Sequence, residues 1–170
     1  MDIALLHVLP VTDEQRPQLA EIVEREWGTT EIISRGEVHD LSRSPAVFCL
    51  EAERVVGLAT YEISGGECEL LTIDAFETQR GIGSRLLDAV AEQARAAGCR
   101  RLWLITTNDN LDAIRFYQRR GLRLVAVHPG AVDRARLLKP QIPLVGNYEI
   151  AIRDELEFEL PFTAWLPGRR

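Results

Sequence analysis

The spacing of apolar side chains predicts an alternation of strands and helices along the chain. An opening strand is predicted over residues 3–9, and a helix from residue 12 or 13 to Trp27. Strands over 46–52 and 54–64 are separated only by a tight turn, which predicts a hairpin. The segment 28–45 has a mixed pattern. Its residues 29–34 fit either a short strand or a loop, and a turn follows them.

The second half of the chain alternates strand and helix more regularly. Strands are predicted over 67–75, 102–106, 122–128 and 152–160, and helices over 85–97, 108–121 and 131–139. In the last strand Leu156, Phe158 and Leu160 are expected to face the core, and Glu155, Glu157 and Glu159 the solvent. This order predicts one α/β domain over residues 1–170, with a mixed sheet covered by helices on both faces.

Composition narrows the class of protein. The chain is 46% hydrophobic and 27% charged, which is ordinary for a soluble domain, and no stretch is apolar enough for a transmembrane helix. A net charge of −6 argues against a nucleic-acid partner. The N-terminus lacks the features of a signal peptide. Cys49, Cys68 and Cys99 lie in apolar runs without metal-type spacing, which predicts buried thiols, no metal site and a cytoplasmic location.

A glycine turn joins the strand over 67–75 to the helix that follows. It reads Gln79, Arg80, Gly81, Ile82, Gly83, Ser84 and opens into the helix at Arg85. The first amides of a helix lack intrahelical acceptors and bind phosphate groups readily. The run lacks the Gly-Lys-Ser/Thr of a P-loop. A dinucleotide-binding fingerprint fits poorly, because Leu86 replaces its third small residue and no acid ends the next strand.

A second motif follows in the correct order: Asn110, Ala113, Phe116 and Tyr117, then Gly121. Together with Gly81-x-Gly83, this pattern resembles the GNAT superfamily of acetyl-coenzyme A dependent N-acetyltransferases. The family pattern begins with Gln or Arg three residues before the first glycine, where this chain has Thr78. The resemblance implies the GNAT fold, with a mixed and mostly antiparallel sheet.

The resemblance also implies acetyl-coenzyme A as co-substrate. Its pyrophosphate would be held by the turn, and its pantetheine arm by strand backbone that splays from a neighbouring strand. The implied cofactor-binding residues are Leu71, Thr72, Ile73, Gln79, Arg80, Gly81, Ile82, Gly83, Ser84, Arg85, Asn110, Ala113 and Phe116. Each of these binding roles has a purely structural alternative. The glycine turn could only connect two elements, the strand could be an ordinary paired one, the arginines could lie on the surface, and Asn110 could be a plain N-cap.

Tyr117 lies at the position of the family's general acid, which protonates the departing thiolate. A phenol stays protonated at neutral pH and can donate to sulfur. The alternative is a tyrosine that only packs in the core. The base is less defined: Glu69 and His39 are candidates, against an outward-facing strand acid and a surface histidine. Trp27 and Arg35 are candidates for the acceptor pocket.

The resulting prediction is an N-acetyltransferase that transfers acetyl directly to a primary amine in a ternary complex. The acceptor would be a small molecule or a peptide, and the acidic balance mildly favours a cationic one. The prediction includes no nucleic-acid or membrane partner, and pairing into a homodimer by analogy with the family. Two rivals remain: a non-catalytic acyl-coenzyme A binding or sensing module, and a nucleotide-binding domain of Rossmann type.

Overall fold

The protein is described by a computed structural model that covers residues 5–162. Its main sheet has seven strands in the order β1–β4–β5–β6–β7–β9–β8. Their bounds are β1 (Leu6–Pro10), β4 (Ala46–Glu51), β5 (Arg54–Ser64), β6 (Glu67–Ala75), β7 (Arg101–Thr107), β8 (Arg123–His128) and β9 (Glu155–Pro161). Only β6 and β7 pair in parallel. The predicted mixed, mostly antiparallel sheet is therefore confirmed, and the parallel sheet that a Rossmann domain needs is not formed.

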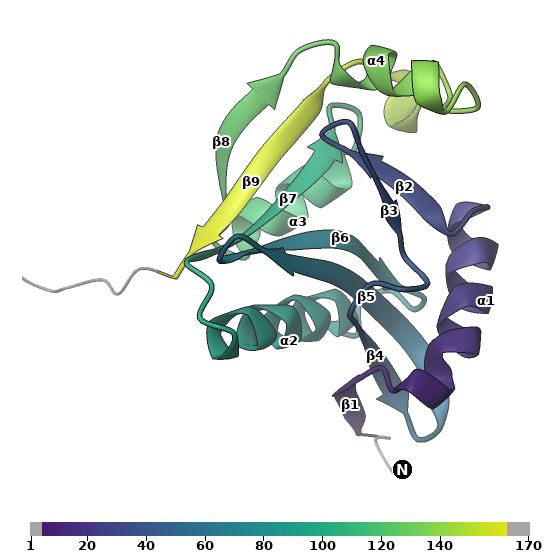
Figure 1. Cartoon of the computed structure of the whole chain (residues 1–170), viewed down its shortest axis with the longest axis vertical. Coiled ribbons are helices and arrows are strands. Elements are labelled where there is room, and N and C mark those ends of the chain that lie inside the picture. Colours follow the sequence, from purple (N-terminus) through teal and green to yellow (C-terminus); the bar gives the residue numbers. More distant parts are fainter. Residues whose placement is uncertain (1–4, 163–170) are drawn as a thin grey trace, which may run out of the picture.

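Helices cover both faces of the sheet, as predicted. They are α1 (Arg16–Trp27, after the short η1, Asp13–Gln15), α2 (Ile82–Ala96), α3 (Leu111–Arg119), α4 (Ala131–Leu138) and the short η2 (Asn147–Glu149). On β4, Ala46 and Phe48 pack in one core cluster with α1, while Val47 and Cys49 pack in another with α2. Alternate residues of a strand point to opposite faces, so α1 and α2 lie on opposite sides of β4 (Figure 1). No helix within residues 5–162 is long and apolar enough to cross a membrane.

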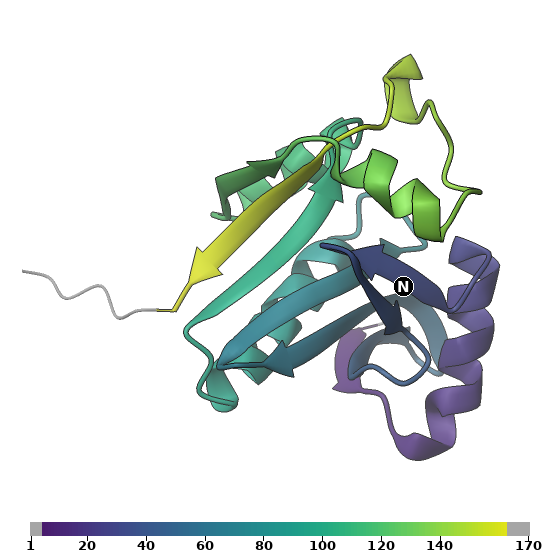
Figure 2. The same ribbon diagram turned by 45° about the horizontal axis from the view of Figure 1, so that its top comes forward.

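The ambiguous segment after α1 forms a hairpin of its own. Strands β2 (Glu31–Ser34) and β3 (Glu37–Asp40) pair antiparallel in a separate two-stranded sheet, with Arg35 in the turn at a φ of 50°. Figures 1 and 2 show this hairpin crossing in front of β5 and β6. A lone hairpin is marginally stable in water, so its contacts with the main sheet matter for its position.

Several element boundaries differ from the sequence prediction. The helix predicted from residue 108 begins at Leu111, and the strand predicted from residue 152 begins at Glu155. The helix expected from Arg85 begins three residues earlier at Ile82, because Gly81 adopts a left-handed φ of 71° and serves as its N-cap. The first strand begins at Leu6, and residues 3 and 4 of its predicted range lie outside the described residues. The predicted domain range of 1–170 likewise includes residues 163–170, which the structure does not describe.

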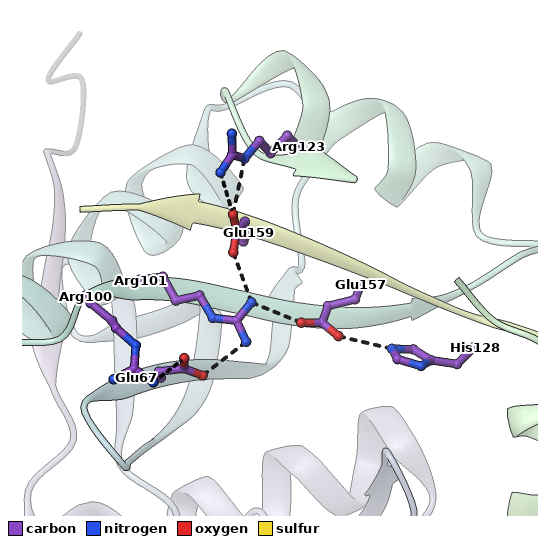
Figure 3. A network of polar contacts seen from close by, with 7 residues as sticks. All are labelled: Glu67, Arg100, Arg101, Arg123, His128, Glu157 and Glu159. Atoms are coloured by element: carbon purple, nitrogen blue, oxygen red, sulfur yellow. Dashed lines mark hydrogen bonds and ion pairs between the residues drawn. The ribbon is translucent and has the colours of Figure 1, made fainter. Parts of the chain in front are cut away.

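The outer face of β9 is not solvated, which corrects the prediction for its three glutamates. Glu155 and Glu157 are only 4% and 6% exposed. Arg101 on β7 donates to Glu157 and Glu159, both at 3.0 Å, and also to Glu67 at 3.1 Å. Figure 3 shows this network, which Arg100, Arg123 and His128 extend. The alternation correctly identified the apolar face, but the opposite face is covered by paired charges instead of water.

Candidate active site

Strands β6 and β7 separate halfway along their length. They pair at Cys68–Leu102, Glu69–Trp103 and Leu70–Leu104, and no pair follows. At the same level the β5–β6 register skips Leu71, so that Thr60 lies opposite Thr72 while Tyr61 lies opposite Leu70. Such a bulge bends a strand and redirects its backbone groups. The two strands fan apart beyond this point (Figure 1), and residues of both strands beyond it line an opening at the carboxyl end of β6.

The glycine turn closes one side of this opening. The first hydrogen bond of α2 runs from Arg85 N to Gly81 O, at 3.1 Å. The amides of residues 82–84 therefore have no acceptor within the helix. Gly83 lies against Phe116 of α3: a Cβ at this glycine would stand 3.3 Å from the ring. A side chain at this position would therefore require the Phe116 ring to shift by a few tenths of an ångström.

A large cavity of about 590 Å³ fills the opening. Its lining includes every cofactor-binding residue predicted from the sequence except Arg85. Trp27 and Tyr117 also line it. Arg85 is exposed and lies outside it. The lining residues are Trp27, Leu71, Thr72, Ile73, Asp74, Ala75, Glu77, Thr78, Gln79, Arg80, Gly81, Ile82, Gly83, Ser84, Ile105, Thr106, Asn110, Asp112, Ala113, Phe116, Tyr117 and Arg120. Asn110 lines the cavity and also caps α3, since its Oδ1 accepts from Ala113 N at 3.3 Å.

Arg80 carries a charge that its neighbours neutralise. Its guanidinium donates to Glu51 at 2.7 Å and to Glu77 at 2.5 Å, and Arg54 also pairs with both carboxylates. These hydrogen bonds raise the pKa of Arg80 and lower the pKa of Glu51 and Glu77. Arg120, by contrast, lines the cavity without an ion-pair partner among residues 5–162. Arg120 is not among the residues that the sequence predicted for the cofactor site.

Tyr117 is buried in the wall of the large cavity. It is 7% exposed, packs against Phe116 and Phe158, and its hydroxyl makes no hydrogen bond with the described residues. Burial, and secondarily the negative charge of Asp74, raise the pKa of Tyr117 far above its usual value. The phenol therefore stays protonated at any physiological pH.

Asp74 is a cavity residue that the sequence argument did not identify. Trp27 Nε1 donates to its Oδ2 at 3.0 Å, which joins the end of α1 to β6. Burial raises the pKa of Asp74, and the Trp27 hydrogen bond opposes that effect. The available signal was a lone acid within residues 70–75, which are otherwise apolar except for Thr72.

Glu69 and His39, the two candidate bases, lie together in a second, acidic pocket. This pocket has a volume of about 330 Å³ and is lined by Ser34, Arg35, Glu37, His39, Glu62, Ser64, Glu67, Glu69 and Trp103. The alternatives of an outward-facing acid and a surface histidine are wrong, because Glu69 is 9% and His39 8% exposed. Ser34 donates to Glu69 Oε1 at 2.5 Å, and His39 Nε2 lies 4.0 Å from Glu69 Oε2.

His39 lies between two carboxyl groups and contacts one of them closely. Its Nδ1 lies 2.7 Å from Glu62 Oε2. An ionised carboxylate only accepts, so Nδ1 carries the hydrogen and the neutral ring keeps its lone pair on Nε2, toward Glu69. Burial raises the pKa of Glu69, while the Ser34 hydrogen bond and His39 oppose the shift. The carboxyl of Glu62 is about half exposed, at 48%. The three groups thus run from a buried carboxyl to solvent.

A small intermediate pocket of about 210 Å³ shares lining residues with both the large cavity and the acidic pocket. It has Trp27, Leu71, Ile105, Thr106 and Asn110 in common with the large cavity, and Ser34 and Glu69 in common with the acidic pocket. Glu69 therefore stands between the acidic pocket and the level at which β6 leaves β7. Arg35 lines the acidic pocket but not the intermediate pocket. Its guanidinium lies 5.5 Å from the centre of the Trp103 ring.

The three cysteines are buried and free, as predicted. Burial raises the pKa of Cys68 to about 12. A thiol with such a pKa is not ionised near neutrality and is a poor nucleophile. None of the cysteines lines the large cavity.

A splayed mixed sheet with a glycine turn at its opening defines a coenzyme A dependent acyltransferase architecture. Residues 9–122 match the Acetyltransferase (GNAT) family, to which the chain belongs. The relatives include two uncharacterized proteins of Bacillus subtilis (strain 168). YdhI is 41% identical over 91% of this chain and 97% of its own length, and YxbD is 32% identical over 89% and 96%.

Solved structures share the fold at low sequence identity. A Bacillus subtilis acetyltransferase in complex with CoA superposes with a TM-score of 0.65 at 16% identity, over 92% of this chain and 99% of its own. A GNAT family acetyltransferase from Elizabethkingia anophelis with acetyl-CoA bound gives a TM-score of 0.66 at 15% identity, over 92% and 97%. The likeness between these structures and the chain confirms the GNAT fold.

Proposed function

We propose that the protein is an N-acetyltransferase that moves an acetyl group from acetyl-coenzyme A to a primary amine in a ternary complex. The observation that carries the proposal is the intermediate pocket where β6 leaves β7, because it shares walls with both the large cavity and the acidic pocket. The large cavity holds a protonated phenol, and the acidic pocket ends at a buried carboxyl. An acid and a base on opposite sides of one reaction point suit acyl transfer from a thioester to an amine.

The coenzyme fits the large cavity by the chemistry of its walls. Amides of residues 82–84 at the start of α2 suit a pyrophosphate, and Arg120 supplies an uncompensated cation nearby. The unpaired edge of β6 from Leu71 to Ala75 offers backbone groups to an amide-bearing pantetheine arm. An N–H on this edge would also polarise the thioester carbonyl. Structural neighbours crystallised with CoA or acetyl-CoA support this assignment.

The acid and base roles follow from the two pKa environments. Glu69 would accept one proton from the incoming ammonium and release it to solvent through the acidic pocket, whose wall includes the half-exposed carboxyl of Glu62. The free amine then forms the C–N bond as the C–S bond breaks. Tyr117 donates its proton to the departing sulfur and regains one from the nitrogen. The transfer releases one thiol and one net proton.

The test is release of free thiol from acetyl-coenzyme A in the presence of an amine panel, with the acetylated product identified by mass. We expect amine-dependent release. Thermal stabilisation by acetyl-coenzyme A without release from any amine would instead establish the rival, a non-catalytic binding or sensing module. The absence of both stabilisation and release would contradict both assignments.

We also propose a cytoplasmic enzyme without nucleic-acid or membrane partners, which pairs into a homodimer. The net charge of −6 supports the absence of a nucleic-acid partner. The edge strand β8 supports the homodimer, because Leu124 and Val127 are each 50% exposed there, and an apolar sheet edge favours pairing with another chain. Light scattering of the purified protein measures the mass, and Val127→Lys should convert a dimer to a monomer.

A further inference from the structure

The acidic pocket has more negative than positive charge. Of its four glutamates, Glu67 is already paired with Arg100 and Arg101, at 2.8 and 3.1 Å. Glu37, Glu62 and Glu69 remain, and Arg35 is the one arginine or lysine among the lining residues. The guanidinium of Arg35 lies over the Trp103 ring, on β7. His39 instead contacts Glu62, on β5. Three carboxyl groups thus face a small space with one arginine.

The backbone brings two of these carboxyl groups together. Glu62 and Glu69 are direct cross-strand partners in the β5–β6 register. Like charges in this position destabilise a sheet unless a cation lies between them. His39 fills only part of that role: its Nδ1 reaches Glu62, but its buried Nε2 has no hydrogen-bond partner among the described residues. At 4.0 Å, Glu69 is too far from Nε2 for a hydrogen bond. At its buried end the pocket therefore has a ring nitrogen and a carboxyl group that make no hydrogen bond with each other.

We propose that the acceptor is a small amine that carries a second cationic centre. The inference rests on the proposed function and names its substrate class. The reacting amine would pass Glu69 into the intermediate pocket, since Glu69 lines both spaces. The second ammonium would remain in the acidic pocket between Glu37 and Glu62, which do not line the intermediate pocket. Ammonium donors on carboxylate acceptors form strong, charge-assisted hydrogen bonds.

The arrangement discriminates against other amines of the same length. A monoamine leaves Glu37 and Glu62 without a counter-charge when it displaces water from the pocket. An amino acid brings a carboxylate to the same place, where it meets like charges and only Arg35 can receive it. Electrostatic complementarity of this kind sets specificity, because the wrong charge is repelled.

The experiment compares three acceptors with a four-carbon chain: putrescine, butylamine and γ-aminobutyrate. Calorimetry on the full chain saturated with coenzyme A measures binding without turnover, and thiol release from acetyl-coenzyme A measures kcat/KM. We expect putrescine to bind roughly tenfold more tightly than butylamine, and γ-aminobutyrate more weakly than either. The preference should shrink as the salt concentration rises, because the second contact is a charge pair.

Glu37→Gln tests the second contact, and should lower the putrescine-to-butylamine ratio about threefold. Glu92→Gln is the matched control: it removes the same charge from an exposed position on α2 and should leave the ratio unchanged. Equal binding of butylamine, tighter binding of γ-aminobutyrate, or an unaltered ratio in Glu37→Gln would each overturn the inference. Preferential binding of putrescine without thiol release would support the inference while contradicting the proposed function.

Discussion

The large cavity and the acidic pocket are built in different ways. The walls of the large cavity come mainly from residues 71–75 and 77–84 and from α3 along its whole length. The walls of the acidic pocket come from short pieces of β2, β3, β5, β6 and β7. The first space therefore depends on local backbone conformation, and the second depends on how distant segments pack.

Their electrostatics differ as well. Beside the glycine turn, two arginines and two glutamates cancel one another, so a phosphate would meet free amides and Arg120 rather than a net positive loop. In the acidic pocket the carboxyl groups exceed their counter-charges. Under the proposed function, the coenzyme would be recognised chiefly by geometry and the acceptor chiefly by charge.

The largest effect is expected at the acidic pocket. Glu69→Gln should lower kcat by about a hundredfold or more, because a positioned base typically contributes that much. Binding of acetyl-coenzyme A should be unchanged, since Glu69 does not line the large cavity. Steady-state kinetics and calorimetry give the two quantities. A kcat within twofold of the parent would exclude Glu69 as the base.

The same substitution makes a pH prediction. Burial raises the pKa of Glu69 above its ordinary value of 4.5. The base must be ionised, so the acid limb of kcat/KM should lie above that value and disappear in Glu69→Gln. A raised pKa means that the carboxyl's contribution to stability is present below pH 4.5 and is lost as pH rises through the folded-state pKa. The stability advantage of the Gln variant should therefore grow with pH in that window, as thermal unfolding would measure.

On the coenzyme side, Tyr117→Phe should lower kcat about tenfold to a hundredfold and leave acetyl-coenzyme A binding intact. Tyr61→Phe is the matched control, because Tyr61 is also buried but lies outside the large cavity. Because burial raises the pKa of Tyr117, no alkaline limb from this phenol should appear below pH ~10. Equal rates for the two variants would remove Tyr117 from the mechanism.

Arg120→Gln should raise KM for acetyl-coenzyme A about fivefold, since it removes the unpaired cation of the large cavity. The effect should diminish at high salt. Arg153→Gln, at an exposed site that does not line the cavity, provides the comparison. If both variants show the same KM, the phosphates do not contact Arg120.

The smallest change is expected from Glu77→Gln, which should lower KM for acetyl-coenzyme A about twofold. It removes one of the two carboxylates that neutralise Arg80, and a freed guanidinium attracts phosphate. The measurement is again the KM for the coenzyme. An increased KM would mean that Glu77 serves mainly to position Arg80.

The coenzyme side was largely predictable from the sequence because its signals are local. Gly81 and Gly83 specify a turn, and the Asn110–Tyr117 motif follows at a fixed distance, so that order alone indicated the fold. Charge compensation was not predictable, because Glu51 reaches Arg80 from a strand 29 residues earlier. The role of Arg120 depends likewise on where α3 packs.

The acceptor side was predicted only as separate residues. Glu69 and His39 were candidates, but a period-two pattern says which face a strand residue occupies and not what covers that face. The hairpin β2–β3 covers Glu69, and nothing local indicates that Ser34 and His39 reach it. Glu157 illustrates the same limit, since Arg101 of a different strand buries it.

The hairpin β2–β3 contributes to one binding space and not to the other. It supplies Ser34, Glu37 and His39 to the acidic pocket, yet exchanges no backbone ladder with the main sheet in the described residues. None of its residues lines the large cavity. Under the proposed function, substitutions within residues 31–40 would therefore alter the choice of amine without touching the walls that hold the thioester.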